Sequence, residues 1–193
     1  MPNAANGEKP TYLGLLNAIS LGEANAGVYL TAWAKATPDK DLAATLRLVA
    51  ARETSHGELF ARRLCELGYE VRHKPDPAAE KRAARLGDPA VSDAAKVGQP
   101  RGEEGDAFAE IKARMARDEF DPMTASLLTW YIGEEVDSAR RLEDAYGRIR
   151  AKANGRASPT DVPSADAQAI MACMTAGFAR LEKSIEKLAK AVK

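Results

Sequence analysis

The sequence is poor in cysteine and aromatic residues, and it has no excess of either charge. Aromatic residues make up 6% of its 193 residues, and the β-branched residues are scattered singly, so nothing favours a β-sheet. Lysine plus arginine and aspartate plus glutamate both number 28, which leaves no basic excess of the kind that nucleic-acid binding requires. No apolar run approaches the roughly 20 residues that cross a bilayer. We therefore expect neither a nucleic-acid partner nor a membrane.

The first residues and the cysteines predict the compartment. Residues 1–8 have neither the basic nor the apolar region of a secretory signal. Cys65 and Cys173 both fall on or near apolar faces of predicted helices, where free thiols pack as small apolar side chains. Reduced thiols are usual in a reducing compartment. These features predict a cytoplasmic protein.

Apolar residues recur with helical spacing along most of the chain. They make up 45% of it, and the abundance of alanine and leucine suits close helix packing. Four long segments repeat apolar residues every three or four positions, which predicts amphipathic helices. We expect one all-α domain over residues 1–193, a four-helix bundle. The predicted helices cover about residues 10–36, 40–67, 121–154 and 164–192.

Turn residues separate these helices. The Thr37-Pro38-Asp39 turn stops the first helix and offers an N-cap to the second, which Gly68 ends. A three-residue connection between two long helices implies an antiparallel hairpin. Asp121 and Pro122 mark the N-cap and first turn of the third long helix.

A connection rich in proline and glycine covers about residues 74–105. It has room for short helical pieces, for instance residues 78–86, and an amphipathic segment at residues 108–120 follows it. In a bundle, a connection of this length is a crossover that lets the second and third long helices run parallel.

Three polar residues occupy core-facing positions of the predicted hairpin. Glu23 interrupts the apolar stripe of the first helix, and Glu53 interrupts that of the second. His56 follows Glu53 by three residues, so an oxygen and a nitrogen can reach one ion. Both glutamates lie about 15 residues from the turn, which places them level at about 1.5 Å per residue. Because a buried carboxylate needs a partner, we predict half of a metal site. A hydrogen-bonded Glu–His pair that fixes helix register is the alternative.

The string Glu53-Thr54-Ser55-His56-Gly57-Glu58-Leu59-Phe60, with Glu23 and the exit at Gly68, resembles the ferritin-like superfamily, and its rubrerythrin-type members most closely. The resemblance covers the four predicted helices in order. It implies an up-down four-helix bundle with a long crossover between helices 2 and 3. It also implies a metal cofactor, iron first with manganese or zinc as alternatives, and ferroxidase, peroxide or oxygen chemistry.

The second half of the chain departs from the family pattern. The third long helix offers Glu134 and Glu135, and the register that aligns Glu135 with Glu23 also matches the flanking apolar positions, so we prefer Glu135 as the inward carboxylate. No histidine follows His73, which lies past the Gly68 break in a predicted loop, so one chain cannot form a symmetric site with two E-x-x-H motifs. The candidate metal ligands are Glu23, Glu53, His56 and Glu135, with Glu134 and Glu182 as alternatives.

Several functions stay open at this point. One is a metal-binding protein that handles iron and oxygen or peroxide through an incomplete carboxylate–histidine site. Another is a non-enzymatic helical interaction or structural protein that has lost an ancestral di-iron site. A homodimer whose two copies each donate Glu23, Glu53 and His56 to one centre is a further arrangement. The sequence does not decide whether the protein is an enzyme.

Overall fold

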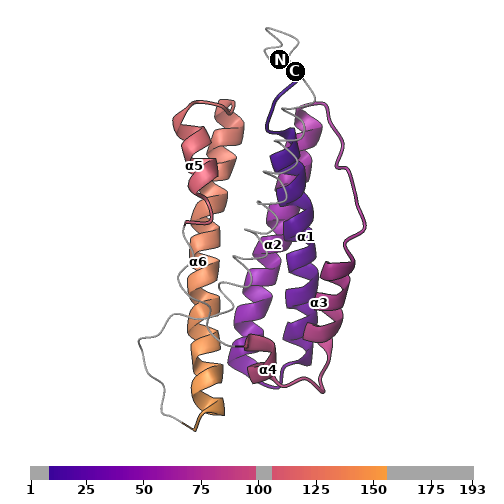
Figure 1. Cartoon of the computed structure of the whole chain (residues 1–193), viewed down its shortest axis with the longest axis vertical. Coiled ribbons are helices and arrows are strands. Elements are labelled where there is room, and N and C mark those ends of the chain that lie inside the picture. The colour runs from indigo at the N-terminus through magenta and orange to yellow at the C-terminus, as the bar shows by residue number, and fades with distance from the viewer. Residues whose placement is uncertain (1–8, 99–105, 156–193) are drawn as a thin grey trace.

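A computed structural model describes residues 9–98 and 106–155, and within these ranges the chain forms helices and no strands (Figure 1). This confirms the predicted all-α class. None of the described helices combines the length and apolarity needed to cross a membrane. The helices are α1 (Leu13–Ala36), α2 (Lys40–Glu66), α3 (Pro77–Gly87), α4 (Asp93–Val97), α5 (Ala109–Ala116) and α6 (Pro122–Ala153).

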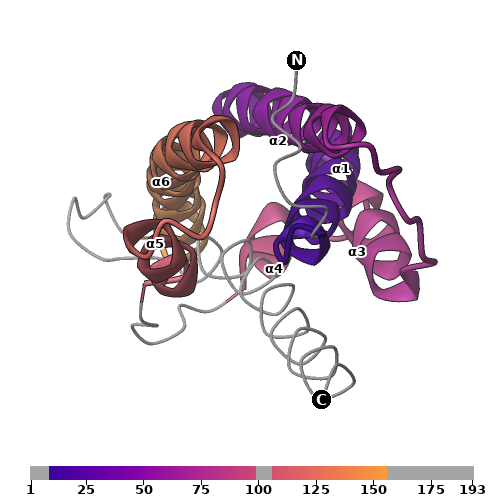
Figure 2. The ribbon, with the colours of Figure 1, turned by 90° about the horizontal axis from the view of Figure 1, so that it is seen from above.

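The hairpin of α1 and α2 follows the predicted boundaries. Asp39 is the N-cap of α2, and its carboxylate accepts hydrogen bonds from the backbone N–H groups of Asp41 and Leu42 at 3.1 and 3.0 Å. Gly68 has a φ of 85°, the left-handed conformation that glycine adopts readily after a helix. The short turn makes the two helices antiparallel neighbours, which lie together when viewed from above (Figure 2).

Two glycines let α1 and α2 approach closely around the predicted half-site. A Cβ atom on Gly57 would lie 3.0 Å from both the backbone nitrogen of Ala24 and the backbone oxygen of Ser20. A Cβ atom on Gly27 would collide with the Thr54 hydroxyl. The Ser20 hydroxyl also donates to the Gly57 carbonyl at 2.9 Å. The two helices therefore approach each other closely at the level of Glu23 and Glu53.

The long helix α6 runs antiparallel to α2, which corrects the parallel arrangement expected of the crossover. At one end, Arg63 of α2 binds Asp121, the N-cap of α6, with 2.7 Å between Nη2 and Oδ1. At the other end, Lys152 of α6 reaches Asp39, the N-cap of α2, with 2.5 Å between Nζ and Oδ2. The contacts at the two ends fix the direction of α6.

The path of the connection explains this direction. The chain leaves the top of α2 and descends through α3, which packs against α1, to α4 near the turn of the hairpin (Figure 1). There Asp93 of α4 accepts hydrogen bonds from the Trp33 indole at 2.8 Å and from the Thr37 hydroxyl at 2.5 Å. By α5 the chain is back at the upper end, where α6 begins. The short helix predicted at residues 78–86 corresponds to α3, and the segment at 108–120 contains α5.

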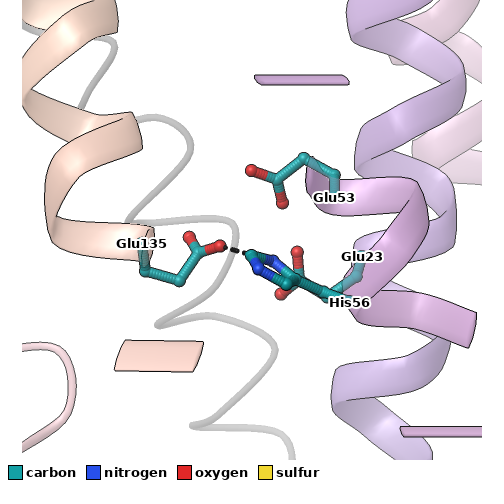
Figure 3. A group of neighbouring side chains, drawn as sticks. All are labelled: Glu23, Glu53, His56 and Glu135. Atoms are coloured by element: carbon teal, nitrogen blue, oxygen red, sulfur yellow. Dashed lines mark ion pairs between the residues drawn. The ribbon is translucent and has the colours of Figure 1, made fainter. Parts of the chain in front are cut away.

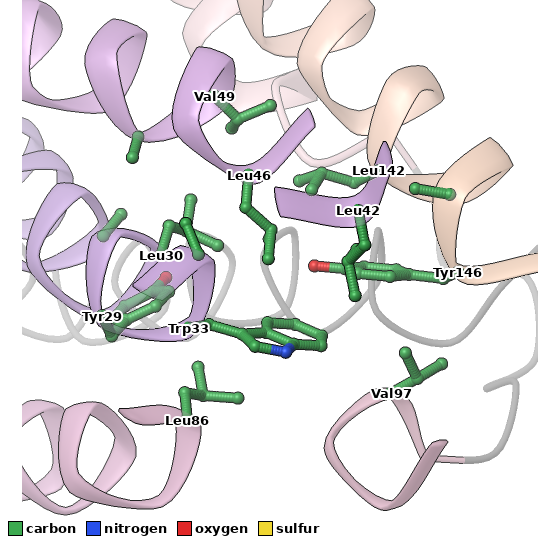
Figure 4. Close-up of a cluster of buried hydrophobic side chains, with 14 of the residues drawn as sticks. Tyr29, Leu30, Trp33, Leu42, Leu46, Val49, Leu86, Val97, Leu142 and Tyr146 are labelled. Carbon is green, nitrogen blue, oxygen red and sulfur yellow. The ribbon is translucent and has the colours of Figure 1, made fainter. Parts of the chain in front are cut away.

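Two apolar clusters fill the described core, one below and one above a polar layer. The lower cluster includes Trp33, which stacks on Tyr146 with 5.3 Å between ring centroids (Figure 4). The upper cluster centres on Phe60, Leu128 and Tyr131. Because both are continuous across α1, α2 and α6, the polar residues between them are sealed from above and below.

The remaining predictions concern the fourth long helix, Cys65 and His73. The helix predicted at residues 164–192, with Glu182 and Cys173, lies outside the described residues, so the four-helix arrangement stays a prediction. Cys65 is exposed on α2 rather than lying on an apolar face, because the inward positions of that turn belong to Phe60 and Leu64. His73 is exposed in the connection after α2, as predicted.

Candidate metal centre

Four buried side chains from three helices converge in the polar layer (Figure 3). They are Glu23 from α1, Glu53 and His56 from α2, and Glu135 from α6, and none is more than 3% exposed. Each offers one donor atom, and these atoms all lie within 4.8 Å of one another. This group, here called the carboxylate–histidine cluster, could hold a metal ion.

Helical register places Glu135 in the cluster and keeps Glu134 at its edge. Glu135 lies on the same face of α6 as the buried residues Tyr131, Ser138 and Leu142. The Glu134 side chain is 28% exposed. The structure thus has the inward orientation that the sequence favoured for Glu135.

Both ring nitrogens of His56 face carboxylates. Nε2 lies 3.0 Å from Glu134 Oε2 in a hydrogen bond. Nδ1 lies 3.0 Å from Glu135 Oε1, an ion-pair distance without hydrogen-bond alignment (Figure 3). The ring meets Tyr131 and Trp130 edge-on, with centroids 5.1 and 5.2 Å away. These two edge-on ring contacts restrict the orientation of the imidazole.

Tyr131 is part of the cluster's surroundings and not simply a core residue. Its hydroxyl donates to Glu23 Oε1 at 2.6 Å. Burial raises the pKa of Tyr131 well above its usual value, and the charges of Glu23 and Glu135 raise it further. The candidate residues predicted from the sequence did not include Tyr131, although its position four residues before Glu135 places both on one helix face. The neutral hydroxyl acts as a fixed donor to Glu23.

Most of the cluster's donor atoms lack a hydrogen-bond partner. Both oxygens of Glu53 are buried without one, and so are Glu23 Oε2, Glu135 Oε1 and His56 Nδ1. Buried polar groups in native proteins are nearly always paired, and an unpaired one costs about 1–3 kcal/mol. A cation bound among these four side chains would satisfy donor atoms that otherwise lack a hydrogen bond.

The protonation of the cluster follows from its burial. Burial raises the pKa of Glu53 well above the usual range, and the neighbouring Glu23 adds to this. Burial raises the pKa of Glu135 to about 7, although His56 opposes the shift. For His56, burial lowers the pKa, but the close carboxylates of Glu135 and Glu134 outweigh it and the net pKa is raised. Without a cation, the cluster therefore retains protons near neutral pH.

A second layer of charged residues lies outside the cluster. Arg52 Nε is 3.6 Å from Glu134 Oε1, and Arg52 Nη1 binds Asp137 Oδ2 at 2.8 Å and Ser138 Oγ at 3.1 Å. Sequence reasoning missed Arg52, although it immediately precedes Glu53. Glu134, predicted as an alternative ligand, instead contacts His56 and Arg52. The other alternative, Glu182, lies outside the described residues.

Comparisons with protein-family models, with curated proteins and with solved structures gave no match for this chain.

Proposed function

We propose that the chain is a metal-binding helical protein in which Glu23, Glu53, His56 and Glu135 hold one divalent cation. The observation that carries this proposal is the convergence of four buried donor side chains within 4.8 Å. A cluster with so many unpaired polar atoms is difficult to explain as packing, since apolar residues would fill the same space at lower cost.

The donor set favours particular metals. Carboxylates suit hard cations such as manganese, and an imidazole suits iron or zinc, so a mixed set favours iron(II), manganese(II) or zinc. Iron comes first because of the resemblance to ferritin-like proteins, in which bound iron supplies oxygen or peroxide chemistry. In this chain, Tyr131 would orient Glu23 by hydrogen bonding, and the apolar clusters would exclude bulk water from the ligands.

A non-enzymatic role is the second candidate, and the protonation of the cluster favours it. With Glu53 protonated and Glu135 partly protonated near neutral pH, fewer charges are buried and the group can persist without a metal. The contacts of His56 with Glu134 and of Tyr131 with Glu23 would then fix the register of the helices. Such a protein would act through its surface, as a bundle that has lost its ancestral site.

Metal content separates the two candidates. The purified protein is loaded anaerobically with Fe²⁺, and separately with Mn²⁺ and Zn²⁺, then desalted and analysed for metal per chain. We expect a single ion per chain in the parent, and loss of that ion in Glu53→Gln and His56→Ala. Glu58→Gln changes an exposed glutamate of the same helix and should bind as the parent does. A parent that binds none of the three metals would favour the non-enzymatic role. Light scattering on the same samples tests the homodimer.

A further inference from the structure

The residues that precede two of the candidate ligands meet outside the cluster. Arg52 precedes Glu53 on α2, and Glu134 precedes Glu135 on α6. Because successive residues on a helix point about 100° apart, these neighbours of inward carboxylates lie at the protein boundary. Their side chains are 21% and 28% exposed, and Arg52 Nε lies 3.6 Å from Glu134 Oε1. We call this pair the outer clasp.

The two oxygens of Glu134 have different partners. Oε1 faces the Arg52 guanidinium, whereas Oε2 lies 3.0 Å from Nε2 of the fully buried His56. Arg52 is itself fixed by Asp137 at 2.8 Å and by the Ser138 hydroxyl at 3.1 Å, both on α6. Arg52 therefore holds the Glu134 carboxylate at the boundary, in a position to accept a hydrogen bond from His56.

The position of Glu134 decides which nitrogen of His56 is available to a metal. A neutral imidazole carries its proton on one nitrogen, and the other has the lone pair. An acceptor at Nε2 favours the Nε2–H tautomer and leaves the lone pair on Nδ1, the nitrogen that faces Glu135 Oε1 at 3.0 Å. If Glu134 were absent, Glu135 would be the nearest acceptor, the proton would favour Nδ1, and the cluster would lose its nitrogen donor.

We propose that Glu134, held by Arg52, is a positioning residue that fixes the tautomer of His56 and so presents Nδ1 to the cation. This inference rests on the proposed metal-binding function. A carboxylate that accepts from the second nitrogen of a metal-bound histidine typically contributes 10- to 100-fold in affinity. In this proposal, Glu134 acts on the metal through His56 and is not itself a ligand.

The test combines nitrogen NMR with zinc affinity. In ¹⁵N-histidine-labelled protein, long-range ¹H–¹⁵N spectra report the tautomer of each ring, and His73, exposed in a loop, is an internal reference. At a pH high enough for the imidazole to be neutral, we expect Nε2–H for His56 in the metal-free parent and Nδ1–H in Glu134→Leu, with Zn²⁺ affinity lowered about 10- to 100-fold. Glu134→Gln keeps an oxygen that can accept from Nε2–H and should retain the tautomer and most of the affinity.

Asp144→Asn provides the control for loss of a negative charge on α6. Asp144 is exposed and pairs with Arg140 at 3.7 Å, and it lies nearly three turns along α6 from Glu134. It should leave both tautomer and affinity unchanged. An Nε2–H tautomer in Glu134→Leu, or a changed tautomer with parental affinity, would overturn the inference. A parent that binds no Zn²⁺, Fe²⁺ or Mn²⁺ would instead overturn the proposed function, and the metal role of the clasp with it.

Discussion

At the residue scale, the side chains that suit metal binding are unfavourable for the stability of the metal-free protein. Glu53 is fully buried, and neither of its oxygens has a hydrogen-bond partner. Its raised pKa shows that the folded protein disfavours the ionised form. A residue whose charged form the fold disfavours, and which faces three other donors, is expected where selection favours a site over packing.

Replacing Glu53 with methionine should therefore stabilise the metal-free protein. Methionine has a similar length, and it brings no unpaired oxygen into the layer between the two apolar clusters. We expect the free energy of unfolding to rise by about 1–3 kcal/mol, measured by urea denaturation in the presence of a chelator at pH 8. The same variant should bind no metal. A destabilised Glu53→Met protein would mean that the carboxyl group already has good partners in the absence of metal.

Glu135 should make the stability of the metal-free protein depend on pH. Its pKa is raised to about 7 by burial, so the folded state binds a proton that the unfolded state has released above about pH 4.5. The stabilisation by this proton is complete below about pH 4.5 and is lost as the pH rises through about 7. Denaturation curves of the parent and of Glu135→Gln, recorded across this range in chelator, should diverge, with the parent falling relative to the variant by up to about 3 kcal/mol. Parallel curves would contradict the raised pKa.

At the scale of the elements, the contact between α1 and α2 sets the distance between their ligands. Gly57 lies one residue after His56 and packs directly against the backbone of α1 at Ala24 and Ser20. Because backbone atoms cannot move aside as a side chain can, a larger residue there must push the two helices apart. The separation of Glu23 from Glu53 would then increase as well.

Gly57→Ala should weaken both the fold and the site. We expect a loss of about 1–3 kcal/mol in unfolding free energy, together with weaker binding of Zn²⁺ in a titration. Gly147→Ala is the matched control, because a Cβ atom at Gly147 would meet no heavy atom within 4 Å. That change should stabilise α6 by about 0.5–1 kcal/mol and leave metal affinity as in the parent. Equal behaviour of the two variants would show that the close approach has no role in the site.

At the scale of the whole molecule, helix caps and turn residues were enough to predict the hairpin, but they did not predict the path of the chain after it. The caps at Asp39 and Asp121 and the exit at Gly68 depend on neighbouring residues, so their types identified the helix ends. The level positions of Glu23 and Glu53 followed from counting along a hairpin with a short turn. The inward orientation of Glu135 followed from the apolar register of α6.

The direction of α6 could not be predicted in the same way. It depends on contacts between residues far apart in sequence, such as Arg63 with Asp121 and Lys152 with Asp39. The outer clasp escaped prediction for a related reason. Arg52 and Glu134 look like ordinary surface charges on their own helices, and they come into contact only when α2 and α6 pack in antiparallel register.

Because the candidate ligands come from α1, α2 and α6, a bound cation should stabilise the whole fold and not one helix. Free metal at 100 times its dissociation constant adds about 2.7 kcal/mol to the free energy of unfolding. Protons on Glu53 and Glu135 compete with the cation, so the stabilisation should grow from about pH 6 to about pH 8. This is opposite in sign to the trend of the metal-free protein, whose stability falls as the Glu135 carboxyl ionises.

Thermal melts with and without Mn²⁺ at both pH values measure the difference, with Glu53→Met as the variant that should show none. If Mn²⁺ raised the melting temperature of Glu53→Met as much as that of the parent, the bound metal would lie outside the carboxylate–histidine cluster. The same would follow if Mn²⁺ raised the melting temperature of the parent more at pH 6 than at pH 8.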